Sequence, residues 1–180
     1  VMELTVMRRQ PQQFVSDGIE VRQFWAVSSD GERIPYFHVG KNAAPDTPTL
    51  VYAYGGFGVP ELPHYLGSIG KYWLEEGNAF VLANIRGGGE FGPRWHQAAQ
   101  GISKHKSVDD LLAVVRDLSE RGMSSPKHIG LQGGSNGGLI TAAAFVREPQ
   151  SIGALVCEVP LTDMIRYPLL SAGASWTDEY

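Results

Sequence analysis

The chain has 180 residues, a net charge of −4 and a hydrophobic fraction of 43%. These values are typical of one globular domain with a sizeable core, and an acidic chain without a basic cluster argues against a nucleic-acid partner. No run approaches the ~20 apolar residues of a membrane span, so no membrane partner is expected. The one cysteine, Cys157, lies in an apolar run and is predicted to be a buried structural thiol. We expect neither a metal ion nor an organic cofactor.

The first half of the chain alternates between extended segments, turns and one helical stretch. Residues 20–28 and 33–39 flank a turn signal at 29–32, which predicts a β-hairpin. Residues 65–76 have helical spacing, and Gly77 stands at the position that commonly ends a helix. Short buried strands are expected at residues 49–54 and 79–84.

The second half continues with helices and strands in turn. Ser107, with Asp110 three residues on, predicts a helix that opens with a capping box and runs to Gly122. A strand is expected at 128–131, a helix at 136–147 and a strand at 154–159. This alternation implies an α/β fold with a mostly parallel sheet and helices on both faces. Because a sheet that stopped there would leave a central strand as an open edge, we expect residues 1–180 to form a single, incomplete domain.

The most informative motif is Gly-Gly-Ser-Asn-Gly-Gly at residues 133–138. It follows an apolar strand and precedes a helical run, which is the setting of the nucleophile elbow of α/β-hydrolases. In such a turn the Ser135 hydroxyl projects above the sheet, and the Asn136 N–H lies at a helix N-terminus, where it can stabilise an oxyanion. The alternative for Ser135 is a purely structural role in a turn.

A nucleophile of this kind needs a base, and α/β-hydrolases order the triad as serine, acid, histidine. All five histidines of this chain precede Ser135. His128 begins the strand that ends at the elbow, so we expect it about 20 Å away at ~3.3 Å per residue. Asp163 and Asp178 follow Ser135 closely, and a structural role is the expectation for both. We therefore expect a nucleophile without its proton acceptor, in an inactive piece of a larger enzyme.

Four motifs, in the same order and spacing, resemble the prolyl oligopeptidase family of serine peptidases. The resemblance implies an α/β-hydrolase fold, of which this chain would be the N-terminal part of the peptidase domain. The β-propeller and the C-terminal part that bears the acid and the base would be absent. The motifs are residues 52–57 (YAYGGF), 83–92 (ANIRGGGEFG), 133–138 (GGSNGG) and 174–180 (ASWTDEY).

The resemblance also implies roles for individual residues. Ser135 would be the nucleophile, and the Asn136 N–H and the Tyr54 hydroxyl would hold the oxyanion. The Asn136 side chain would be a further contact for the substrate backbone. A flat proline ring suits aromatic and apolar walls. For each residue implied to form these walls, the alternative is an ordinary place in the core. The residues implied to line this proline pocket are Phe57, Leu161, Trp176 and Tyr180.

Within this family, Asn136 of the elbow and the indole of Trp176 favour cleavage after proline over cleavage after arginine or lysine. Family members with the latter specificity have Gly-x-Ser-Ala-Gly-Gly and lack the Trp176 platform. Pro160-Leu161 resembles bacterial members. The glycine-rich segment 86–90 lacks the Lys-Ser/Thr ending of a P-loop, so we interpret it as a tight loop that shapes the site rather than as a nucleotide site.

In the complete protein we therefore expect a serine-type endopeptidase or oligopeptidase that cleaves proline-containing oligopeptides through an acyl-enzyme. The alternatives are a related serine hydrolase (a dipeptidyl or acylaminoacyl peptidase, or an esterase) and a non-catalytic binding module. The remainder of the enzyme, or another copy of the chain, is the expected protein partner. No signal peptide is visible, and a cytoplasmic location is expected. Because the chain opens with Val1, we expect a natural N-terminus to be missing, and the periplasm is the alternative.

Overall fold

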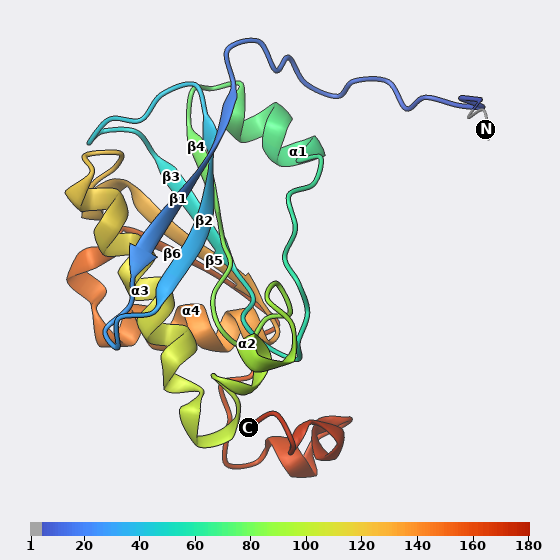
Figure 1. The fold of residues 1–180 in the computed structure, drawn as a ribbon, viewed down its shortest axis with the longest axis vertical. Coiled ribbons are helices and arrows are strands. Elements are labelled where there is room, and N and C mark those ends of the chain that lie inside the picture. The colour runs from blue at the N-terminus through green and yellow to red at the C-terminus, as the bar shows by residue number, and fades with distance from the viewer. Residues whose placement is uncertain (1–4) are drawn as a thin grey trace.

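The computed structural model describes residues 5–180, and the first four residues of the expected domain lie outside this range. One six-stranded sheet organises the chain, in the order β1-β2-β4-β3-β5-β6 (Figure 1). The strands are β1 (Glu20–Val27), β2 (Arg33–Gly40), β3 (Thr49–Ala53), β4 (Ala79–Ala83), β5 (Ile129–Gly134) and β6 (Ala154–Glu158).

The sheet is mostly parallel, as predicted. The hairpin strand β1 pairs antiparallel with β2, and β2 pairs antiparallel with β4. From β4 onward the pairs β4–β3, β3–β5 and β5–β6 are all parallel. Parallel neighbours place their carboxyl ends at one edge, and α/β proteins use this edge for their sites. The segments that follow β3, β4 and β5 therefore meet there.

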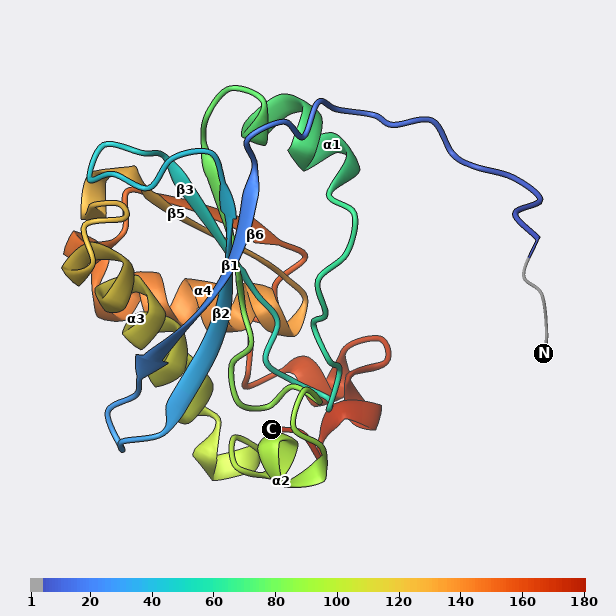
Figure 2. The same cartoon turned by 45° about the horizontal axis from the view of Figure 1, so that its top comes forward.

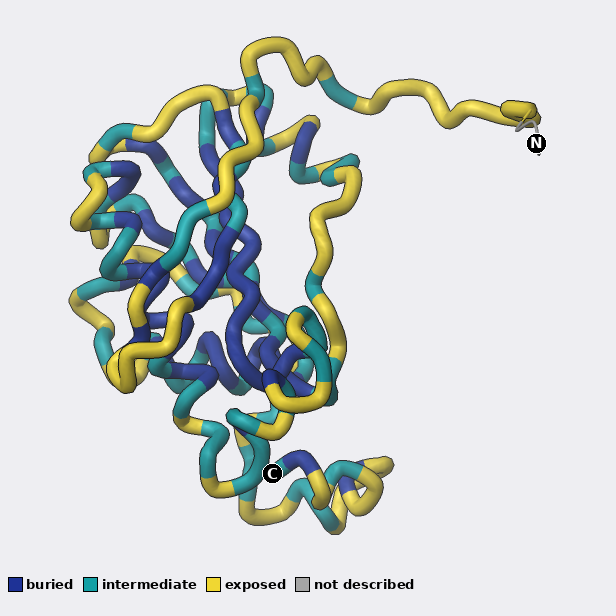
Figure 3. Tube along the Cα trace, viewed as in Figure 1, coloured by how far each residue is buried: buried dark blue, intermediate teal, exposed yellow. Residues whose placement is uncertain are grey.

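Helices cover both faces of the sheet, as predicted, and alternate residues of β4 show why. Val81 and Ala83 point into the larger apolar cluster, which contains the buried faces of α3 (His105–Glu120) and α4 (Asn136–Arg147). Phe80 and Leu82 point to the opposite face, where Leu74 completes a second cluster. Figure 2 shows α3 and α4 together on one side and α1 on the other. The fully buried β4 forms the centre between the two layers, seen dark in Figure 3.

The helix predicted at residues 65–76 is shorter and less regular than expected. One α-turn, α1 (Gly67–Ile69), leads into a π-helical turn, η1 (Gly70–Leu74), and Glu75 N–H bonds to Gly70 O at 3.1 Å. Phe14 from the N-terminal segment packs on Gly70, where a Cβ would overlap its ring. Gly77 ends the segment in a left-handed conformation (φ 87°), as predicted.

The capping box predicted at Ser107 is wrong. The helix α3 begins two residues earlier, at His105, and Ser107 lies inside it. The Ser107 hydroxyl donates to the Arg86 carbonyl at 2.7 Å instead. Asp110 is fully buried and pairs with the Arg86 guanidinium, a long-range partner that the local pattern does not show.

Short helical turns complete the chain. They are α2 (Pro93–Gln97), η2 (Gly101–Ser103), η3 (Pro126–His128), η4 (Pro149–Ser151), η5 (Tyr167–Leu169) and η6 (Gly173–Trp176). Both ribbon views place the C-terminal turns beside α2, at the same end of the molecule (Figures 1 and 2). Cys157 is only half-buried, on the edge strand β6, which corrects the expectation of a fully buried thiol. Within residues 5–180, no helix has the length and apolarity to cross a membrane.

Candidate active site

Ser135 occupies a strained turn between β5 and α4. Its backbone has φ 53° and ψ −116°, which is rare for a residue with a side chain and costs of order 1–3 kcal/mol. The surroundings hold the turn in place: the Ser135 N–H donates to Glu158 O at 2.9 Å, and Ser135 O accepts the Leu139 N–H at 3.1 Å. This strand–turn–helix geometry is that of a nucleophile elbow.

Two glycines of the motif permit this turn because other backbone comes too close for a side chain. A Cβ on Gly133 would overlap the Gly137 carbonyl, and a Cβ on Gly137 would overlap the Ala53 carbonyl. The N-terminus of α4 therefore lies directly against the end of β3. This close approach brings the elbow next to Tyr54, the first residue after β3.

Two hydrogen-bond donors accompany Ser135. Asn136 is the first residue of α4, so its N–H has no acceptor within the helix and lies at the positive end of the helix dipole. Burial, and secondarily the charges of Glu179 and Glu61, raise the pKa of the Tyr54 phenol, while a hydrogen bond with Ser135 opposes the shift. The phenol therefore stays protonated at neutral pH and can donate a hydrogen bond.

The Asn136 side chain braces the site from inside. It is 0% exposed, its Nδ2 donates to the Tyr54 carbonyl at 2.6 Å, and its Oδ1 accepts the Tyr180 hydroxyl at 3.0 Å. Both ends of the amide are thus engaged within the chain, and a contact of this side chain with a substrate backbone stays a prediction. Asn136 ties the elbow to two of the other predicted site residues.

The four residues predicted to form a proline pocket fall into two pairs. The rings of Phe57 and Tyr180 meet edge to face, with centroids 5.9 Å apart. Leu161 and Trp176 line a hollow of about 230 Å³ together with Tyr167. Tyr167 joins the pairs, because its ring lies 5.3 Å from that of Tyr180. Tyr167 lies between two of the motifs, and no pattern in the sequence indicates it.

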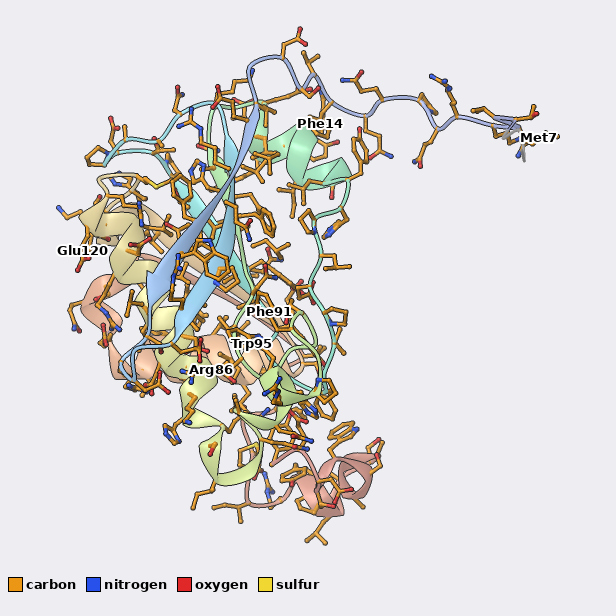
Figure 4. The ribbon with its side chains drawn as sticks, in the orientation of Figure 1. Met7, Phe14, Arg86, Phe91, Trp95 and Glu120 are labelled. Carbon is orange, nitrogen blue, oxygen red and sulfur yellow. The ribbon has the colours of Figure 1, made fainter. Side chains whose placement is uncertain are left out.

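The loop that carries Tyr54 and Phe57 is supported by an ionic cluster around a buried arginine. Arg86, labelled in Figure 4, is 3% exposed and binds Asp110 through Nε at 2.9 Å and Asp30 through Nη1 at 2.6 Å. The Ser107 hydroxyl bonds the Arg86 carbonyl, and the Gly58 N–H donates to Gly87 O at 3.1 Å. The glycine-rich segment therefore packs its backbone on residues 55–58.

No base for Ser135 is found among the histidines of residues 5–180. His64, His96, His105 and His128 each bond to another residue, and His38 is buried in β2. Over the same residues, no group of three acidic, histidine or cysteine side chains is arranged to hold a metal ion. The described residues thus bring together an elbow serine, two hydrogen-bond donors, and aromatic and apolar side chains.

An elbow serine at the carboxyl edge of a mostly parallel sheet defines the α/β-hydrolase class. The model of the prolyl oligopeptidase family matches residues 66–180, and the chain belongs to this family. The family predicted from the sequence is thereby confirmed.

Relatives and solved structures agree with this assignment. The chain is 46% identical, over 94% of its length, to the "Uncharacterized peptidase y4nA" of Sinorhizobium fredii. A post-proline cleaving enzyme from Rickettsia typhi superposes over 99% of the chain with a TM-score of 0.95 and 44% identity. Prolyl oligopeptidase B from Galerina marginata, solved bound to a 35mer hydrolysis and macrocyclization substrate, superposes over 93% with a TM-score of 0.89 and 32% identity. The chain spans about a quarter of the length of each of these proteins: 24%, 26% and 24%.

Proposed function

We propose that this chain is the nucleophile-bearing part of a serine peptidase that cleaves oligopeptides after proline. The observation that carries the proposal is the elbow: a strained Ser135 lies between a free helix N-terminal N–H and a protonated phenol. This arrangement is suited to acyl transfer, because negative charge develops on the substrate oxygen between those two donors.

In the proposed reaction, Ser135 attacks the carbonyl carbon that follows the proline ring. The Asn136 N–H and the Tyr54 hydroxyl hold the oxyanion, the amine leaves with a proton, and water then releases the acyl-enzyme. Since none of the five histidines bonds to Ser135, we propose that the base and its acid belong to the part of the protein outside this chain. The chain alone would then be inactive.

Specificity for proline is supported by the aromatic walls. Phe57, Tyr180, Tyr167 and Trp176 offer flat faces and edges, and Leu161 adds an apolar one. Such walls suit a compact pyrrolidine ring. Asp163, a carboxylate that also lines the hollow beside Trp176, is already paired with Arg166. The names of the Rickettsia typhi and Galerina marginata proteins support the same substrate class.

The test is a substrate panel on the full-length protein that carries this chain. Short chromogenic peptides with proline, alanine or arginine before the scissile bond are compared with a simple ester. We expect kcat/KM for the proline peptide to exceed that for each other substrate by at least about tenfold, which is within the range that an apolar pocket can discriminate. Preference for arginine, or for the ester over every peptide, would assign a different hydrolase, and no turnover by a folded protein would favour the binding module.

A further inference from the structure

Glu179 is a buried carboxylate beside the proposed proline pocket, and the proposed chemistry does not use it. It is 3% exposed, and it directly precedes Tyr180 in the chain. Its Oε1 accepts the Phe57 N–H at 3.0 Å and also the Lys104 ammonium, and its Oε2 contacts His96 Nε2 at 2.6 Å. Three separate segments therefore converge on one side chain.

Phe57 needs such a support. Its backbone has φ 56°, in the left-handed region that a bulky side chain rarely adopts. A residue in this conformation persists only where its surroundings fix it. The Glu179 carboxylate fixes the Phe57 N–H directly, and a turn bond from Val59 N–H to Gly56 O at 3.0 Å closes the loop around it.

The charge at Glu179 is balanced within the cluster. Burial alone would raise its pKa, but hydrogen bonds from Lys104, His96 and the Phe57 N–H outweigh burial and hold the pKa below its ordinary value. The carboxylate is thus ionised at neutral pH and remains an acceptor. Its own backbone is anchored too, because the Gly101 N–H donates to Glu179 O at 2.9 Å.

Glu179 is connected both to the proposed proline pocket and to the Ser135 elbow. Through Phe57 it sets one aromatic wall, and through its neighbour Tyr180 it is linked to Asn136, which accepts the Tyr180 hydroxyl and holds the Tyr54 carbonyl. We propose that Glu179 is a positioning residue that holds Phe57 against Tyr180 and thereby sets the preference for proline. This inference rests on the proposed function, since it names how that same pocket is made selective.

The matched pair Glu179→Met and Glu179→Gln tests the inference in the full-length protein. Both substitutions keep the length of the side chain, but only glutamine keeps an oxygen that can accept the Phe57 N–H. We expect E179M to lower the ratio of kcat/KM for a proline peptide over its alanine analogue by about tenfold or more, mainly through KM, as for a lost wall of an apolar pocket. E179Q should keep most of the ratio.

The control is Glu75→Met. Glu75 also accepts a backbone N–H, that of Val15 at 2.7 Å, and a lysine, Lys71 at 2.7 Å, but on the far side of the sheet. E75M should leave both substrates unaffected. Labelling of Ser135 by a fluorophosphonate should proceed at the wild-type rate in all three variants, which shows that the nucleophile is intact.

Equal losses on the proline and alanine peptides in E179M, or an unchanged ratio, would overturn the inference. If E179M does not fold, Glu179→Ala, which leaves room for water at the Phe57 N–H, is measured with the same two outcomes. A wild-type protein that does not cleave after proline would defeat the proposed function instead. The positioning claim is then decided by a crystal structure of the folded variant: Phe57 outside the left-handed region supports it, and an unchanged Phe57 overturns it.

Discussion

A methyl group on Gly137 should damage catalysis through the oxyanion site. The added Cβ would fall about 1 Å inside ordinary contact with the Ala53 carbonyl and 3.2 Å from the Tyr54 Cα. The start of α4 and the end of β3 therefore have to separate by roughly that distance. This separation moves the Asn136 N–H away from the Tyr54 hydroxyl, although neither group is altered. Because a misplacement of ~1 Å at a reacting centre can cost about 10²-fold, we expect Gly137→Ala to lower kcat about 100-fold, or about 2.7 kcal/mol.

The assay is steady-state cleavage of a chromogenic proline peptide by the full-length protein. Gly130→Ala is the matched control, since it lies on β5 upstream of the elbow and its Cβ would meet neighbours only at 3.6 Å and beyond. We expect G130A to retain kcat within about threefold, allowing for small adjustments. A G137A protein that keeps wild-type kcat, or one that loses no more than G130A, would refute the argument that backbone contact between α4 and β3 sets the oxyanion geometry.

Three further outcomes are expected in the same protein. Tyr54→Phe should lower kcat about 10²–10³-fold with little change in KM, as for the loss of one oxyanion donor, and an unchanged kcat would remove Tyr54 from the reaction. Asp110→Ala should cost about 3–5 kcal/mol in urea unfolding, because Arg86 stays buried without its main partner, and a loss under about 1 kcal/mol would contradict that view. Since the pKa of Glu179 lies below its ordinary value of 4.5, its stabilisation is complete above that pH and is lost as the pH falls through the lower folded pKa. The melting temperatures of wild type and E179Q, measured against pH, should therefore converge in acid. A constant difference between the two proteins at all pH values would be the contrary result.

Local patterns predicted the fold correctly in most places. The prediction failed where a residue that is distant along the chain determines the local structure. Hydrophobic runs and turn residues correctly predicted the hairpin, the parallel strands and α4, because these elements are bounded by glycine, proline or a change of period. Ser107 and Asp110 have the spacing of a capping box, yet both are taken by the backbone or side chain of Arg86, which lies 21 and 24 residues away along the chain. Spacing cannot show such a partner.

The candidate site likewise contains residues that the local sequence predicts and residues that only long-range contacts reveal. The Ser135 elbow and its glycines carry a steric requirement that is visible in the sequence itself, and the structure shows the close approach that demands it. The roles given to Tyr54, Phe57, Leu161, Trp176 and Tyr180 remain predictions that the proposed experiments address. The sequence does not indicate Glu179, although it lies in the motif of residues 174–180, because its burial and its partners 75 to 122 residues away cannot be seen from local spacing.

The central claim is that Ser135 is the nucleophile of a post-proline peptidase, and site mapping of a fluorophosphonate adduct tests it most directly. Full-length protein is treated with the probe in the presence or absence of a competing proline peptide and digested with trypsin, and the peptide of residues 128–147, whose only serine is Ser135, is sequenced by mass spectrometry. The account predicts one adduct, on Ser135, that forms more slowly when the proline peptide is present and is absent from Ser135→Ala. An adduct on another residue, or peptide cleavage that survives in Ser135→Ala, would contradict it.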